Sequence, residues 1–425
     1  MVGNDIHQFA KELWPINRSI TGEGVRETLQ KISVHLPKHK IKSVKSGKKV
    51  FDWTIPKEWR VKKAYILTPG GKKICDFSKN NLHLVGYSVP FKGKLSLNEL
   101  KEHLYTIPDK PDSIPYVTSY YEERWGFCIS QNQYSNLENG IYQVVVDSIL
   151  FDGELNYGEL LIPGKSDKEI FLSTYICHPS MANNELSGPT VLTFLAKWIQ
   201  KINQRNYSYR IIFIPETIGS IAYLNSNLKI MKKNIFAGYN VTCVGDDRCY
   251  SYLPSRNGDT ISDKIAKHVL KWIDPNFVKY SWLDRGSDER QYCAPGVDLP
   301  VASILRSKYG SYPEYHTSLD DLQNVVTPKG LDGGYWALKN AIIAIEKNKK
   351  YKAIILAEPQ MGKRGLYPTL SKKEKNVDTR FMMDFISFCD GKNSLLEIAE
   401  NLGIAIWELY SLVDKLMIHK IIKEQ

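Results

Sequence analysis

The chain has 425 residues, of which 43% are hydrophobic and 24% charged, and it carries a net charge of +11. This length exceeds a single core of the usual size, so two or three domains are expected. A run of about 18 apolar residues is missing, and the charged N-terminal segment lacks the apolar core of a signal peptide. We therefore predict a cytoplasmic protein without a membrane partner. The seven cysteines include no C-x-x-C pair, which argues against a disulfide framework and against a thiolate zinc site.

The positive charge is concentrated in one stretch. Between His35 and Cys75 there are twelve lysines or arginines, against only Asp52 and Glu58. Such a stretch is usually a solvated face of the protein. The alternative is a surface for an acidic partner or substrate, and the sequence does not separate the two.

The sequence of the first 140 residues predicts two structurally different segments. Residues 1–40 contain two helical patterns, which we expect to join the main core, with residues 21–24 supplying cap chemistry to the second helix. Residues 41–140 change to short β-prone runs that are broken by proline and glycine turns. This pattern predicts an inserted β-rich domain, in which most aromatic residues pack in the core and at turns.

Predicted strands and helices alternate from residue 141 to residue 352. This order is typical of an α/β core with a mostly parallel sheet that is covered by helices on both faces. We predict strands at 140–147, 157–162, 170–175, 210–215, 236–244 and 300–305, and helices at 189–202, 218–225, 259–272 and 328–346.

Residues 366–425 predict a separate winged-helix-like domain. Three helical patterns with short glycine turns precede a β-prone tail. Positive and negative residues nearly balance in this segment, whereas a nucleic-acid reader should be basic. We therefore expect docking or dimerisation and no nucleic-acid binding, with a homo-oligomer formed through this domain or the β-rich one.

Polar residues follow four of the predicted core strands at the points where those strands end. One such residue alone is usually structural, but four groups at one sheet edge indicate a site. Imidazole and carboxylate side chains suit a catalytic Zn²⁺, which keeps an open position for water, and a further glutamate can take the proton of that water. The residues are His178, Asn183, Asn184 and Glu185 after the first strand, Glu216 after the second, Asp246 and Asp247 after the third, and His316 and Asp320 after the last.

Several motifs together carry a family resemblance. They are LWPINRSITG at 13–22, CHPS at 177–180, LSG at 186–188, PETIGS at 215–220, CVGD at 243–246 and YHTSLD at 315–320. Over essentially its full length the chain resembles bacterial aminopeptidase-like domain proteins that are associated with polysaccharide biosynthesis. The resemblance implies a zinc-exopeptidase-like core, an inserted β-rich domain and a C-terminal winged helix. It also implies a site similar to those of zinc aminopeptidases that use a nucleophilic water.

The resemblance implies roles for individual residues. His178 and His316 match the two ligand histidines, and Glu216 matches the general base. Asp246 is the first carboxylate after the position, near Thr242, where a later aspartate ligand is expected. One or two zinc ions are the implied cofactor.

Three positions depart from the family pattern of two zinc ions. Asn184 stands where an aspartate bridges the ions, and asparagine brings no charge to such a bridge. Thr217 replaces the second of two paired glutamates, and Ser180 replaces the aspartate that follows the first histidine. A single metal ion is therefore one of the expected outcomes.

A polar loop at 285–292 is the predicted substrate-binding segment. Arg285 or Arg290 could pair with a carboxylate, and Asp288 or Glu289 could hold a free amine. The alternative is a solvated loop that caps a helix. Cys177 could suggest a thiol nucleophile, but we interpret it as a buried cysteine at a strand end.

The sequence thus predicts a metal-dependent, aminopeptidase-like hydrolase that acts on a small peptide or a related amide-containing substrate. Two alternatives remain open. One is a rebuilt site that acts on an amino-sugar or peptidyl intermediate of a biosynthetic pathway. The other is a non-catalytic binding or scaffold protein, a pseudoenzyme of such a pathway.

Overall fold

The computed structural model describes residues 2–366 and 376–425. They form two compact units, one of Met1–Asp263 with Phe277–Trp336 and the other of Lys264–Asn276 with Ala337–Gln425. Within these described ranges, no helix has both the length and the apolar character needed to cross a membrane.

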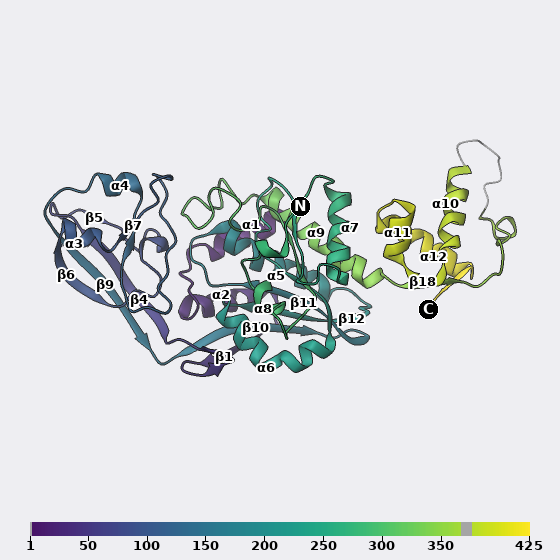
Figure 1. Ribbon diagram of the computed structural model, residues 1–425, viewed down its shortest axis with the longest axis horizontal. Helices are drawn as coiled ribbons and strands as arrows, with labels where there is room; N and C mark the ends of the chain where they lie inside the picture. Colours follow the sequence, from purple (N-terminus) through teal and green to yellow (C-terminus); the bar gives the residue numbers. More distant parts are fainter. Residues whose placement is uncertain (1, 367–375) are drawn as a thin grey trace. The chain divides into compact units, whose positions relative to one another are not determined.

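An eight-stranded sheet organises the first unit, in the order β1-β10-β12-β11-β13-β16-β14-β15 (Figure 1). The strands β12, β11, β13 and β16 run parallel, and the last seven residues of β11 are all buried, as expected for a strand that is covered on both faces. The bounds are β1 Lys40–Lys45, β10 Glu154–Ile162, β11 Ser166–Tyr175, β12 Tyr207–Ile214, β13 Ile235–Asn240, β14 Ser251–Leu253, β15 Val278–Lys279 and β16 Val301–Leu305.

The chain reverses direction across the sheet at β11. It passes from β11 through α5 (Ser187–Gln200) to β12 on one side, then through α6 (Ile218–Asn234) to β13 on the other side. Because such crossovers are right-handed, α5 and α6 lie on opposite faces of the sheet, as Figure 1 shows. The carboxyl end of β11 is therefore a topological switch point, where open α/β sheets form ligand crevices.

The N-terminal helices complete one layer of this core. Helix α1 (Val2–Leu13) packs against α5, and α2 (Glu23–His35) contacts both α5 and β10. The remaining helices of the α/β part are α7 Ile261–Ile273, α8 Glu289–Tyr292 and α9 Pro328–Lys347, of which α7 and α9 have residues in both units.

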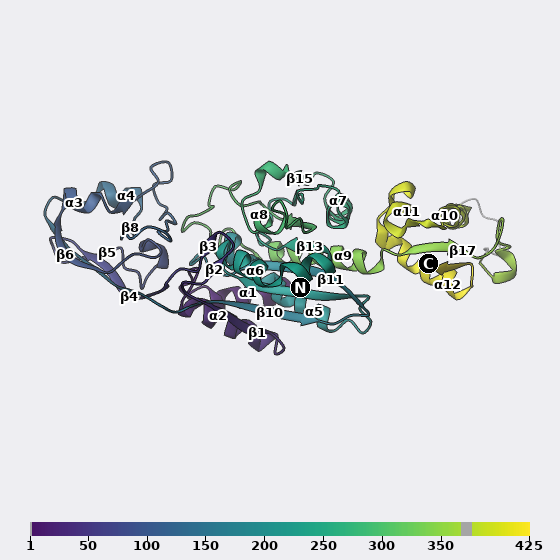
Figure 2. The same cartoon turned by 60° about the horizontal axis from the view of Figure 1, so that its bottom comes forward.

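The segment between β1 and β10, residues 46–153, forms the insertion, which is built on a four-stranded antiparallel sheet (Figure 2). Its order is β5 (Lys73–Ile74), β4 (Glu58–Leu67), β9 (Ile141–Phe151) and β6 (Phe91–Ser96). The smaller elements are β2 Lys49–Val50, β3 Trp53–Thr54, α3 Leu97–Lys101, β7 Leu104–Tyr105, β8 Phe127–Cys128 and α4 Gln131–Ser135.

Two strand assignments need correction. The strand predicted at 140–147 for the core sheet is β9, which pairs with β4 and β6. In its first half buried and more exposed residues alternate, as in an antiparallel strand with one covered face. Conversely, β1 lies within the range predicted as β-rich, yet it forms an edge of the core sheet by pairing with β10.

The C-terminal part of the second unit has the three helices and short strands of a winged helix. The cap of α11 is a Ser394–Glu397 capping box, and Gly403, with φ of 66°, ends that helix. The strand order is β18-β17-β19. The elements are β17 Lys350–Ala353, α10 Asn376–Ser387, β18 Asp390–Ser394, α11 Leu395–Leu402, α12 Tyr410–Ile418 and β19 Ile422–Glu424. Of the range predicted as winged-helix-like, 366–425, residues 367–375 lie outside the described residues.

Candidate active site

The candidate site lies at the carboxyl end of β11. The strand ends at Tyr175, and the following loop carries Cys177 and His178. A single π-helical turn, Ala182–Leu186, then presents Glu185 before α5 begins. Short π-helical segments of this kind are frequent at functional sites.

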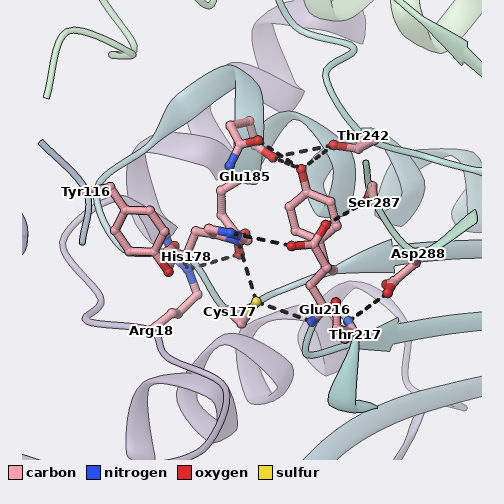
Figure 3. A network of polar contacts seen from close by, with 12 residues as sticks. Arg18, Tyr116, Cys177, His178, Glu185, Glu216, Thr217, Thr242, Ser287 and Asp288 are labelled. Carbon is pink, nitrogen blue, oxygen red and sulfur yellow. Dashed lines mark hydrogen bonds and ion pairs between the residues drawn. The ribbon is translucent and has the colours of Figure 1, made fainter. Parts of the chain in front are cut away.

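Two charged residues fix the orientation of His178 (Figure 3). Its Nδ1 lies 3.0 Å from Glu185 Oε2, and Glu185 in turn lies 3.4 Å from the Nε of Arg18. The same Arg18 Nε–H donates to the main-chain oxygen of His178 at 3.1 Å. The side chains of Arg18 and Glu185 have no exposed surface. A carboxylate on one ring nitrogen is the support that metal-ligating histidines usually have, and it leaves Nε2 for the site.

Glu216 faces that free nitrogen. Its Oε2 lies 3.7 Å from His178 Nε2, while its Oε1 accepts a hydrogen bond from Ser287 Oγ at 2.7 Å. Burial raises the pKa of Glu216 against the opposing effect of His178. Burial lowers the pKa of His178, but Cys177, Tyr116 and the hydrogen bond with Glu185 outweigh this effect, so the net pKa is well above its usual value and a metal would have to displace the Nε2 proton to bind there.

A strained turn aims Glu216 at His178. The next residue, Thr217, has φ of 62° and ψ of −78°, which is rare for a β-branched residue. The main-chain N–H of Thr217 donates to Asp288 Oδ1 at 2.8 Å, and that of Glu216 donates to Cys177 Sγ at 3.3 Å. Asp288 and Cys177 thus hold the backbone on both sides of the Glu216 side chain.

His316 reaches the site from the loop after β16. Its ring stacks on Tyr315 with 3.9 Å between centroids and lies 5.7 Å from the ring of His178. Tyr116 of the insertion lies 5.2 Å from the ring of His178 and 5.1 Å from that of His316, and its N–H donates to His316 O. Burial, with His178 nearby, lowers the pKa of His316 to about 3, so its imidazole is neutral and able to bind a metal.

His178 and His316 are two donors that could share one metal ion, one fewer than the three protein ligands of a usual catalytic zinc site. Two imidazoles that share a zinc at about 2.0–2.1 Å have their ring centroids roughly 5 Å apart, close to the observed separation of His178 and His316. A second group of donor atoms, from Cys177, His178 and Glu185, lies within 4.8 Å. That group is less suited, because Glu185 is paired with Arg18 and burial raises the pKa of the Cys177 thiol to about 11.

A second ion does not fit at Asn184. The hydroxyl of Tyr175 lies 3.2 Å from Asn184 Oδ1 and 2.5 Å from Thr242 Oγ1, so the two uncharged residues join one buried network. Asn184 Nδ2 is buried without a partner in the described part of the chain. Neutral oxygens here offer a divalent ion no compensating charge.

Asp246 is occupied by structural hydrogen bonds. Its two carboxylate oxygens accept from Asn183 Nδ2, Arg248 N, and both the N and Oγ of Ser307, at distances between 2.9 and 3.0 Å. This carboxylate ties the loop after β13 to the loops of β11 and β16. Each of its oxygens already accepts two hydrogen bonds, which makes it a poor metal ligand in this arrangement.

The loop at 285–292 divides into structural and pocket-lining residues. Glu289 accepts hydrogen bonds from Gly286 N, Ser287 N, Tyr309 Oη and Asn240 Nδ2, which uses both of its oxygens. Arg285 lies over the ring of Trp282 and donates to the main-chain oxygen of that residue. Of the four predicted substrate-binding residues, Arg290 lines the pocket at His178 and Glu216, whose volume is about 230 Å³.

Sequence reasoning did not assign roles to Arg18 and Tyr116. Arg18 lies in the LWPINRSITG motif, which marked the family, but 160 residues separate it from His178. Tyr116 belongs to the insertion, whose aromatic residues we interpreted as packing. The signal that could have indicated a role for Arg18 was its charge within this N-terminal motif, because a charged residue in such a motif needs a partner elsewhere in the chain.

The comparisons with known proteins agree with this fold. A protein of Clostridium acetobutylicum, provisionally named a polysaccharide biosynthesis protein with aminopeptidase-like domain, is 46% identical over 404 residues, which cover 95% of this chain and 92% of that protein. A crystal structure of a C. acetobutylicum protein, provisionally named a peptidase, has a TM-score of 0.94 at 44% identity and covers 100% of this chain and 97% of its own.

Two distant structures show the fold alone. A zinc aminopeptidase of Bacillus subtilis has a TM-score of 0.59 at 12% identity, with 81% of this chain and 94% of that chain covered. A peptidase M28 precursor of Shewanella amazonensis has a TM-score of 0.58 at 13% identity, with coverage of 84% and 95%. The predicted α/β fold and the predicted resemblance are confirmed.

Family profiles cover nearly the whole chain. A winged helix-turn-helix profile matches residues 349–424. The profile described as domain of unknown function DUF4910 matches residues 7–348, and the chain therefore belongs to the DUF4910 family.

Proposed function

We propose that the protein hydrolyses an amide bond of a small peptide or related amide substrate with the help of one bound zinc ion. The observation that carries this proposal is the pairing of His178 Nε2 with Glu216 Oε2, 3.7 Å apart in a pocket, while Glu185 holds the other ring nitrogen. The zinc aminopeptidase fold of the distant structures supports it.

His178 and His316 would hold the ion. When bound, zinc would polarise the substrate carbonyl and lower the pKa of a water molecule. The residues of the chain supply the remaining chemistry. Glu216 accepts the proton of the attacking water and passes it to the leaving amine, and its Ser287 hydrogen bond keeps Oε2 directed into the site. Arg18 and Glu185 keep the His178 ring in place.

A specific observation favours a second candidate, a non-catalytic binding protein of a biosynthetic pathway. Uncharged Asn184 and Thr242 occupy one buried network at the place where the zinc aminopeptidase pattern has charged ligands. A substrate analogue would then bind without being cleaved. The provisional name of the C. acetobutylicum relative is consistent with a pathway role.

Metal removal distinguishes the two candidates. Purified full-length protein is assayed on a set of aminoacyl and acyl 4-nitroanilides before chelation, after chelation, and after addition of zinc. For a hydrolase we expect activity that is lost on chelation and restored by zinc. Activity that survives in metal-free protein, or cleavage of none of the anilides at any zinc level, would contradict the proposal. Heat-denatured protein with the same zinc content controls for free metal.

A further inference from the structure

The pocket beside Glu216 has an aromatic wall that the insertion supplies. Trp53 of β3 and Tyr121 meet edge to face with 5.5 Å between ring centroids, and Tyr120 lies beside them in the lining. His178 and Glu216 line the same pocket. A volume of about 230 Å³ is below the usual range for drug-sized ligands, so the pocket suits one small terminal group of a substrate.

No carboxylate of this pocket is available to bind the ammonium group of a peptide N-terminus. Glu289 is fully used by four hydrogen bonds and is buried. Asp288 does not line the pocket: its Oδ1 accepts hydrogen bonds from Thr217 N and Ser220 Oγ, and its Oδ2 is buried without a partner among the described residues. The carboxylate that does line the pocket is Glu216, which the proposed reaction uses as its base.

The pocket instead contains a cation. The guanidinium of Arg290 is fixed by two hydrogen bonds, from Nε to Ser287 O and from Nη2 to Thr217 Oγ1, both 3.0 Å long. In the described ranges, no Asp or Glu oxygen lies within ion-pair distance of Arg290. Its two hydrogen-bond acceptors are neutral, and its charge also lowers the pKa of Glu216 in the same pocket without a direct ion pair. The planar guanidinium matches the geometry of carboxylate and phosphate oxygens.

We propose that this pocket binds a terminal group that carries an oxyanion, a carboxylate or a phosphate, between Arg290 and the Trp53–Tyr121 wall. The inference rests on the proposed amide hydrolysis and names its substrate class: an amide with an acidic acyl group, in place of a peptide with a free N-terminal ammonium. Aromatic side chains would cover the apolar part of that group while Arg290 fixes its charged end.

Binding to the chelated, metal-free chain, which should not turn over, tests the inference separately from hydrolysis. The full wild-type chain in this form is titrated with four 4-nitroanilides, carrying succinyl, phosphonoacetyl, alanyl or acetyl groups, and the fluorescence of the tryptophans is followed. We expect the succinyl or the phosphonoacetyl anilide to bind at least about tenfold more tightly than the alanyl one. A hydrogen bond to a charged group contributes enough binding free energy for a difference of this size. The first two anilides distinguish a carboxylate from a phosphate-like group.

Arginine variants then locate the effect. Arg290→Gln should reduce binding of the anionic anilides to the level of the acetyl one, and Arg290→Lys should retain part of the preference. Arg285→Gln, which changes an exposed arginine outside the pocket, should leave all four affinities unchanged. Tighter binding of the alanyl anilide, or an anion preference that survives Arg290→Gln, would overturn the inference. If anions bind as expected but no anilide is cleaved by the wild-type chain, the proposed hydrolysis fails and the binding site stands.

Discussion

Replacing Glu216 with glutamine is expected to lower the rate constant of amide hydrolysis by about 10²–10⁴-fold, the usual contribution of a general base. Glutamine has nearly the same size and can still accept the Ser287 hydrogen bond through its amide oxygen. It cannot take a proton from water. The measurement is kcat on the best anilide at saturating zinc, together with the zinc content of the variant.

Two comparisons make this result interpretable. Glu122→Gln, which alters an exposed carboxylate of the insertion, should leave kcat unchanged. Ser287→Ala should lower kcat less than Glu216→Gln, since it removes only the hydrogen bond that orients the base. Wild-type kcat in a Glu216→Gln variant with normal zinc content would show that another group acts as the base.

Replacing Arg18 with methionine is expected to destabilise the first unit by about 3–5 kcal/mol, because the buried Glu185 loses its guanidinium partner and keeps only His178. Neither side chain has exposed surface, so water cannot compensate. The change also releases the main-chain oxygen of His178. Since partners of ligand histidines contribute about 10–100-fold to metal affinity, zinc binding should weaken as well. Urea unfolding followed by circular dichroism and zinc titration measure the two effects.

The double variant Arg18→Met with Glu185→Gln separates stability from metal binding. With both charges removed, much of the lost stability should return, because no unpaired ion remains. Zinc affinity should stay low, because a neutral amide now faces His178 Nδ1. Full recovery of zinc affinity in the double variant would mean that the charge on Glu185 does not support His178.

Much of the fold could be predicted because its core strands are continuous apolar runs. The strand predicted at 170–175 is observed as Ser166–Tyr175, and the helix predicted at 218–225 extends to Asn234. The strand at Ile141–Phe151 was assigned to the wrong sheet. The sequence pattern predicts a strand here, but it does not show which strand will pair with it.

The candidate site was predictable where adjacent strands determine it. His178 and Glu216 follow β11 and β12, which are neighbours in the sheet, so their proximity follows from the topology. Asp246 and Glu289 could not be assigned in this way, because their occupation by main-chain and amide donors is visible only in three dimensions. The identity of the metal ligands stays a prediction.

Zinc titration of metal-free protein tests the central claim most directly. In calorimetry of the chelated and dialysed full chain, we predict one zinc ion per chain for the wild type and no binding at this site for the His178→Ala, His316→Ala double variant. The Asn184→Asp variant shows whether the missing carboxylate limits the site to one ion. Absence of zinc binding by the wild type, two ions per chain, or one ion that persists in the double histidine variant would contradict a single-metal site at His178 and His316.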